Sequence, residues 1–154
     1  IKNNLTCIGV KNDNNEVIAS INILPIEKGV FYDIYENKMN EVDLKYNQIE
    51  EYRNNNSYYI YLSSISIDKK YRNNYKVITT LLKGSINLFN TLIKRNIKIE
   101  KVMADACTMH GEKICKKLLK MNFITNTSHD SKIYCKAGEV FINEIKKLAC
   151  KYGK

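Results

Sequence analysis

The chain has 154 residues, of which 44% are hydrophobic and 27% are charged. This length suits one domain with its own core, and these proportions exclude wholesale disorder. No apolar run approaches the roughly 20 residues that a membrane-spanning helix needs, and no signal peptide is visible. We therefore expect one cytoplasmic domain over 1–154 without membrane contact. The sequence opens at Ile1, which is compatible with a longer protein that has a preceding strand and helix.

The formal net charge of +9 at pH 7 raises the question of nucleic-acid binding. The lysines, however, are spread along several segments, and no motif combines basic and aromatic residues in the manner of a nucleic-acid reader. A basic surface also suits a small ligand that carries several phosphate groups. We therefore expect the anionic partner to be a phosphorylated small molecule and not a nucleic acid.

The cysteines are odd in number and far apart in the sequence. They are Cys7, Cys107, Cys115, Cys135 and Cys150. No C-x-x-C pair occurs and only two histidines are present, so we predict neither a disulfide framework nor a metal site. This cysteine usage favours a reducing cytoplasm.

The chain begins with a predicted hairpin. Leu5–Val10 and Val17–Ile26 alternate well enough for two strands, and the sequence KNDNNE between them has the Asn and Asp residues of a turn. Pro25 stands where the second strand should end.

The pattern weakens from Glu27 to Asn56, where we expect two short helices joined by a polar loop. Both stretches have apolar residues at helical spacing. The first has Val30, Phe31, Ile34 and Tyr35, and the second has Leu44, Gln48, Ile49 and Tyr52.

The strongest pattern in the chain is a strand, a basic loop and a long helix. Tyr58–Ile67 has apolar residues on both faces, which indicates a central strand, and Val77–Ile93 repeats its apolar residues at helical spacing. Lys69, Lys70, Arg72 and Lys76 crowd the loop between them. Because the free N–H groups and the dipole of a helix N-terminus favour an anion, this loop is the first candidate site for phosphate.

A second strand–helix unit and a closing pair of strands follow. Ile97–Thr108 is a strand that runs into a helix, with Thr108 as its predicted N-cap. Phe123–Thr127 and Lys132–Phe141 suit two paired strands, and Ile142–Tyr152 suits an amphipathic C-terminal helix. No repeat or linker divides the chain.

From about Leu5 to Phe141, this order of elements resembles the GNAT superfamily of acyl-CoA-dependent N-acetyltransferases. Two segments carry the resemblance in detail: ISIDKKYRNNYKVITTLL, beginning at Ile65, and VMADACTMHGEKICKKLLKMNFI, beginning at Val102. The first is similar to the family's cofactor segment, and the second to its strand, helix and terminal G-F, with Asn122 in place of Gly. The resemblance implies an α/β (α+β) fold with a mixed, twisted, mostly antiparallel sheet and helices on both faces.

The resemblance also implies acetyl-CoA as co-substrate, with its phosphates at Arg72–Val77 and its pantetheine along Ile65–Ile67. The implied cofactor residues are Ile65, Ser66, Ile67, Arg72, Asn73, Asn74, Tyr75, Lys76, Val77 and Thr108. The family's loop has glycines where this chain has Tyr75 and Val77. Asn tolerates the left-handed conformation, so Asn73 and Asn74 can supply part of the turn, and Lys76 can add a direct charge.

Candidates for proton transfer are fewer. Many family members place a tyrosine in the second helix to protonate the departing thiolate, but the two possible alignments put Leu118 or Cys115 there. Cys115 is then a candidate acid or a buried structural residue. Asp105 is unexpected in an apolar strand, so it is a candidate general base or a partner for backbone groups. His110 is a candidate base or an exposed residue at a helix start.

Three functions remain open. The first is an N-acetyltransferase that acts on the amine of a small molecule or a protein. The second is a catalytically silent GNAT-like domain that binds acyl-CoA or a protein partner, and the third is a basic nucleic-acid-binding domain. The first is the leading hypothesis, the missing glycines and tyrosine count in favour of the second, and the lack of a recognition motif disfavours the third. A homodimer is compatible with the sequence.

Overall fold

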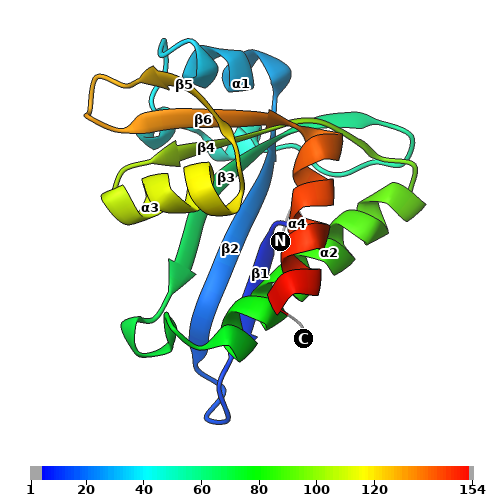
Figure 1. Ribbon diagram of the computed structural model, residues 1–154. Helices are drawn as coiled ribbons and strands as arrows, with labels where there is room; N and C mark the ends of the chain where they lie inside the picture. Colours follow the sequence, from blue (N-terminus) through cyan, green and yellow to red (C-terminus); the bar gives the residue numbers. More distant parts are fainter. Residues whose placement is uncertain (1–4, 153–154) are drawn as a thin grey trace.

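The computed structural model describes residues 5–152, which form a six-stranded mixed sheet in the order β1-β2-β3-β4-β6-β5 (Figure 1). The strands are β1 (Cys7–Lys11), β2 (Val17–Ile26), β3 (Ser57–Ile67), β4 (Lys98–Ala106), β5 (Asn122–Asn126) and β6 (Lys132–Ala137). The helices are α1 (Lys28–Tyr35), α2 (Tyr75–Lys94), α3 (Met109–Lys113) and α4 (Gly138–Tyr152). β3 and β4 are parallel, and the other paired strands are antiparallel. The predicted fold class and the central place of Tyr58–Ile67 are therefore confirmed.

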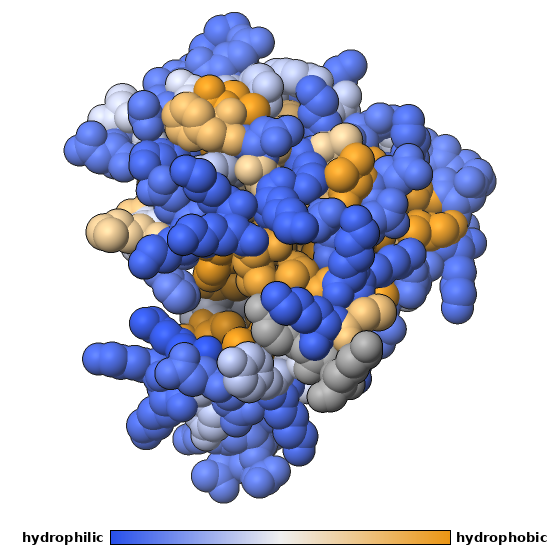
Figure 2. Space-filling model, viewed as in Figure 1, coloured by the Kyte–Doolittle hydropathy of each residue, from blue (hydrophilic) through white to orange (hydrophobic). Residues whose placement is uncertain are grey.

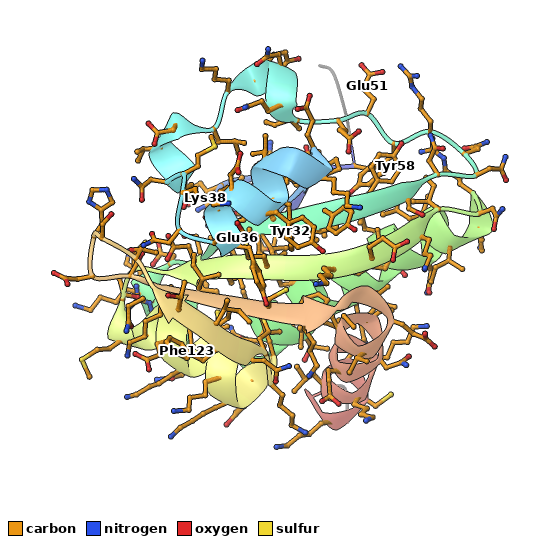
Figure 3. All side chains as sticks on the ribbon, turned by 90° about the horizontal axis from the view of Figure 1, so that it is seen from above. Tyr32, Glu36, Lys38, Glu51, Tyr58 and Phe123 are labelled. Atoms are coloured by element: carbon orange, nitrogen blue, oxygen red, sulfur yellow. The ribbon has the colours of Figure 1, made fainter. Side chains whose placement is uncertain are left out.

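Helices cover both faces of the sheet, as predicted. Seen from above, α1 lies on one side, with Tyr32 toward the sheet, whereas α3 and α4 lie on the other side (Figure 3). α1 buries Phe31 against the side chains of Tyr61 and Met103, in a cluster separate from the larger core on the opposite face. The two faces of the sheet therefore have separate hydrophobic cores.

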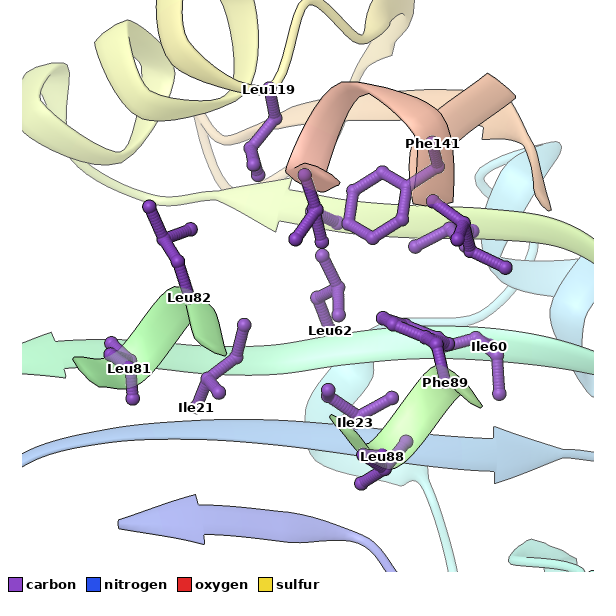
Figure 4. Close-up of a cluster of buried hydrophobic side chains, with 14 of the residues drawn as sticks. Ile21, Ile23, Ile60, Leu62, Leu81, Leu82, Leu88, Phe89, Leu119 and Phe141 are labelled. Carbon is purple, nitrogen blue, oxygen red and sulfur yellow. The ribbon is translucent and has the colours of Figure 1, made fainter. Parts of the chain in front are cut away.

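The larger core lies between the sheet and α2, with α4 beside it (Figure 4). α2 presents a continuous apolar stripe because its hydrophobic residues recur at helical spacing. Phe89 from this stripe is fully buried and meets the ring of Phe141 from α4 edge to face, with 6.0 Å between ring centroids. This packing holds α2 against the sheet, and therefore positions the basic loop that precedes the helix.

The prediction of a second short helix between Glu27 and Asn56 is wrong. α1 confirms the first, but the chain then makes two single 3₁₀ turns, η1 (Glu41–Asp43) and η2 (Tyr46–Gln48), and extends so that Ile49 pairs with Ile26. The apolar residues of this stretch turn to different partners, because Leu44 packs against the α1 cluster and Tyr52 packs against Tyr58 in the core on the other face. Helical spacing here does not describe one buried face.

The last strand is shorter than predicted. β6 ends at Ala137, and α4 begins at Gly138, before the expected start at Ile142. A side chain at Gly138 would overlap the backbone of Ile99 in β4, so only glycine allows the chain to leave the sheet here. In the part of the chain that the structure describes, no helix combines the length and apolar character needed to cross a bilayer.

Candidate functional site

A β-bulge at Ser63 divides β3 into two halves. Before the bulge, β3 pairs with β2 on one side and β4 on the other, and its last partner in β4 is Ala104, opposite Leu62. After the bulge, Ser64–Ile67 pairs with β2 alone among residues 5–152. Because a bulge bends its strand and strengthens the local twist, β3 and β4 separate at this point. The separation opens the sheet in its centre.

The second half of β3 has backbone groups that face this opening. Asp68 donates its N–H to the carbonyl of Ile18 in β2, with 2.8 Å between the atoms. In an antiparallel pair, hydrogen-bonded and non-hydrogen-bonded residues alternate, so the peptide groups of Ser64 and Ser66 also face β2. Those of Ile65 and Ile67 face the opening. Arg72 confirms this direction, because its Nε lies 3.3 Å from the carbonyl oxygen of Ile67 and donates to it.

A cleft of about 590 Å³ occupies the opening. Its walls are the second half of β3, the end of β4 and the start of the following helix. The lining residues are Glu41, Leu62, Ser63, Ser64, Ile65, Ser66, Ile67, Arg72, Ala104, Asp105, Cys107, Thr108, His110, Gly111, Ile114 and Cys115. In the space-filling view, the face is hollowed between α3 and the start of α2, and apolar side chains gather there within a hydrophilic surround (Figure 2). The volume is that of an ordinary small-molecule site.

The cleft brings together most residues that the sequence singled out. Both catalytic candidates line it, and so do the cofactor candidates Ile65, Ser66, Ile67, Arg72 and Thr108. Asn73, Asn74, Tyr75, Lys76 and Val77 do not line this cavity and lie on the exposed approach to α2 or, for Val77, in the core. The assigned roles remain predictions.

The start of α2 is already capped by the chain itself. Asn74 accepts hydrogen bonds at Oδ1 from the backbone N–H groups of Lys76, at 3.0 Å, and Val77, at 3.4 Å. Both N–H groups belong to the first turn of α2, where we predicted that a phosphate would bind. Four cations of this segment, Lys69, Lys70, Arg72 and Lys76, have exposed side chains. The loop therefore offers charge more directly than it offers free backbone N–H groups.

The helix after β4 begins as predicted and then widens. Thr108 accepts a hydrogen bond at Oγ1 from the N–H of Gly111, at 3.0 Å, which confirms it as the N-cap. α3 continues into a π-helical turn, η4 (Ile114–Leu118), a feature often found beside functional sites. The wide turn places Cys115 in the wall of the cleft, whereas Leu118 lines a separate apolar pocket. Burial, followed by the charge of Asp105, raises the pKa of Cys115 to about 11.

The separate pocket lies on the helix-covered side of the cleft and measures about 200 Å³. It is walled mainly by leucine and isoleucine side chains of α2, η4 and β3. Ile65, Ile67, Arg72, His110 and Ile114 line both cavities, so the two adjoin. The cleft therefore has an apolar extension toward α2.

On the α1 side, the cleft is acidic. Asp105 follows Ala104, the last β4 residue that pairs with β3, and its Oδ1 is buried without a hydrogen-bond partner in residues 5–152. Glu41 of η1 also lines the cleft and accepts a hydrogen bond at Oε2 from the hydroxyl of Tyr61, at 2.8 Å. Burial raises the pKa of Glu41 and the charge of Asp105 raises it further, whereas the hydrogen bond from Tyr61 lowers it.

Sequence reasoning missed Glu41. The acid lies in the weakly patterned connector, and nothing in its neighbours distinguishes it from Glu36, Glu50 or Glu51. Asp105, in contrast, was predicted because an acid is unusual in an apolar strand. His110 is exposed at the helix start, as one alternative predicted, and it also lines the cleft, while a role as base stays a prediction.

Comparison with known proteins gives only distant similarities. No family model matches the chain, and no curated protein matches it. Among solved structures, arylalkylamine N-acetyltransferase 2 from Aedes aegypti is similar with a TM-score of 0.45 and 14% identity, over 85% of this chain and 72% of that one. NAA60 from Arabidopsis thaliana, solved with a bisubstrate analogue, has a TM-score of 0.35 and 11% identity, over 83% and 70%.

Proposed function

We propose that this chain is an N-acetyltransferase that moves an acetyl group from acetyl-CoA to an amine. The observation that supports this function best is the opening between β3 and β4, where the peptide groups of Ile65 and Ile67 face a cleft that ends near a basic loop. A pantetheine arm consists of peptide groups linked by short alkyl segments, so an unpaired strand can hold it as a neighbouring strand would.

The donor would enter from the side covered by α2 and α3. Its phosphates would lie beside Arg72 and Lys76, which are exposed cations at the start of α2. Its pantetheine arm would follow Ile65–Ile67, with the thioester near the separation point. The adjoining apolar pocket would accommodate the alkyl part of the arm. Asn74 would have to release the N–H groups of Lys76 and Val77 for them to reach a phosphate.

The chemistry requires a neutral amine, a polarised carbonyl and close contact between them. The amine nitrogen attacks the thioester carbon, a C–N bond forms, the C–S bond breaks and CoA leaves as a thiolate that takes up a proton. A free N–H of β3 would donate to the carbonyl oxygen, and Asp105 is the proposed base. With a pKa of about 11, Cys115 is a weak acid at neutral pH, so we expect Cys115→Ala to retain turnover within about twofold.

Calorimetric titration with acetyl-CoA tests donor binding. We expect Arg72→Ala/Lys76→Ala to weaken it about tenfold or more, with a larger loss at low salt than at high salt, because exposed charges are screened. Lys94→Ala is the matched control for Lys76, since it removes an exposed lysine from the opposite end of α2. Equal affinity in the double variant and the wild type would place the phosphates elsewhere.

Thiol release in the presence of amines tests the transfer itself. An acetyltransferase releases CoA thiol faster with an accepted amine than in buffer alone. If acetyl-CoA binds and no amine accelerates thiol release, the protein is a silent binding domain.

A further inference from the structure

We propose that Glu41 and Asp105 form a seat for the acceptor, which we infer to be a primary alkylamine bound as its ammonium ion. The inference rests on the proposed function for its chemistry, but it concerns the side of the cleft that faces α1. The two carboxylates, together with the hydroxyl of Tyr61 beneath Glu41, are called the ammonium seat below.

The first step of the argument is position. Asp105 is the first β4 residue after the last β3–β4 pair, so it stands where the sheet opens. It pairs with Ile133 of β6, a member of the α1-side core, which puts Asp105 on that face. Tyr61 belongs to the same core, and its hydroxyl reaches Glu41 of η1. The seat therefore lies across the opening from α2 and from the basic loop.

The second step is an unmet hydrogen bond. Asp105 lines the cleft, and its Oδ1 is buried without a donor within residues 5–152. A buried acceptor left unpaired is costly, so such atoms in native proteins usually meet a partner, water or ligand. An ammonium group brings three N–H donors and a positive charge. It can satisfy Asp105 and Glu41 together and still present its nitrogen to the opening.

The third step is the acid–base character of Glu41. Tyr61 is fully buried and its pKa is far above the ordinary value, mainly because of burial and then because of the charge of Glu41. Its hydroxyl therefore stays protonated and fixes Glu41 by donation. Burial and Asp105 raise the pKa of Glu41 above 4.5, which makes it a better proton acceptor than a solvated carboxylate.

The proton balance follows from this arrangement. The bound ammonium gives one proton to Glu41, and the neutral amine attacks the thioester carbon. As the C–S bond breaks, the nitrogen loses its second proton to Asp105, the proposed base in the transfer step, and this proton then neutralises the CoA thiolate. Glu41 then releases its proton to solvent, so the products are an N-alkylacetamide, CoA thiol and one proton.

The seat also defines which amines are excluded. A carboxylate next to the reacting amine would face Glu41 and Asp105, and like charges at this range repel each other. We therefore expect free amino acids to be poor acceptors. A simple alkylamine and the same chain with a carboxylate on the carbon that bears the nitrogen form a matched pair, n-butylamine and 2-aminopentanoate.

Binding without acetyl-CoA tests the seat independently of transfer. In backbone NMR of the wild type near pH 7, n-butylamine should shift the signals around Glu41 and Asp105, and 2-aminopentanoate should bind at least about tenfold more weakly. Glu41→Gln and Asp105→Asn should each weaken n-butylamine about 10–100-fold, the range for hydrogen bonds to charged groups. Glu51→Gln, an exposed acid of the same connector, should change nothing.

Turnover gives a second readout. In the wild type, kcat/KM for n-butylamine should fall as pH decreases through the raised pKa of Glu41, because the protonated form cannot accept a proton. Tyr61 from β3, Asp105 from β4 and Cys107 after β4 are the ionisable groups whose charges act on this site. Glu41→Gln should lower kcat/KM about 10²–10³-fold and remove this acidic limb, since its amide does not titrate there.

The two proposals fail separately. If n-butylamine does not bind the wild type at these residues, or binds the two variants equally well, the ammonium seat is wrong even when another amine supports thiol release. If n-butylamine binds at the seat and neither it nor any other amine accelerates thiol release, the seat stands and the transferase function is wrong.

Discussion

The two halves of β3 show how one strand can serve both structure and chemistry. The first half buries Tyr58, Ile60 and Leu62 in the core, and its residues Tyr59–Leu62 pair with β2 on one side and β4 on the other. Ser64–Ile67 pairs on one side only and forms the wall of a cleft. The bulge at Ser63 separates the halves. It also shifts the alternation of side chains, so that Ile65 and Ile67 continue to pack against the same core while their peptide groups face the opening.

β4 is divided in the same way, because it pairs with β3 as far as Ala104 and no further. The largest effect of a substitution is expected at Asp105, the next residue. Asp105→Asn should reduce turnover with a good amine about 10²–10⁴-fold, because a positioned general base typically contributes that much. The affinity for acetyl-CoA should stay within about twofold, since Asp105 faces the acceptor side. Steady-state kinetics and calorimetry measure the two quantities. Wild-type turnover in Asp105→Asn would remove this residue from the mechanism.

The second prediction concerns how much each half of β3 contributes to the free energy of unfolding. Ile60→Ala should lower the free energy of unfolding by about 3 kcal/mol, because Ile60 is fully buried and the truncation leaves a cavity. Ile65→Ala should cost clearly less, since its side chain is only partly buried beside the cleft. Urea denaturation with a common slope measures both. Equal losses would mean that the second half of β3 is as much a part of the core as the first.

A third effect concerns the backbone of the free half. Ile65→Pro removes the side chain and also the N–H that faces the cleft, whereas Ile65→Ala removes only the side chain. Because proline is tolerated where a strand has no partner on that side, the fold should persist. We expect Ile65→Pro to lower kcat/KM for acetyl-CoA about tenfold more than Ile65→Ala does, the loss of one hydrogen bond to the donor.

Steady-state kinetics at saturating amine measures this difference, and circular dichroism checks that both variants are folded. If the two variants lose activity equally, the N–H of residue 65 makes no contact with the donor.

The elements with regular patterns could be predicted from the sequence. β2 has the predicted bounds, and α2 contains the predicted helix, because alternation and helical spacing each describe one continuous buried face. The connector could not be predicted in this way. Leu44, Ile49 and Tyr52 have helical spacing, yet each packs against a different partner. The boundary between β6 and α4 was also missed, because it depends on a close approach of Gly138 to Ile99 in another strand.

The two sides of the cleft also differ in how well their residues could be predicted from the sequence. Asp105 and Thr108 could be predicted as cleft residues because each is an unusual residue in or after a regular strand, and Arg72 because it lies in a basic loop before a regular helix. Glu41 was not found, since its place beside Tyr61 and Asp105 depends on how an irregular connector folds back over the sheet. A single sequence contains no signal for that contact.

The smallest expected effect lies where the free half of β3 leads into the basic loop. Asn74→Gly removes the side-chain oxygen that occupies the N–H groups of Lys76 and Val77, and it lets a phosphate approach the backbone. We expect acetyl-CoA to bind up to about tenfold more tightly, while the helix loses only a few tenths of a kcal/mol. Asn74→Asp is the matched control, because it keeps the cap and adds a negative charge, so it should stabilise α2 and weaken acetyl-CoA. Calorimetry and thermal unfolding separate affinity from stability. If Asn74→Gly binds acetyl-CoA no better than the wild type, the phosphates are held by the side chains of Arg72 and Lys76 and not by the helix N-terminus.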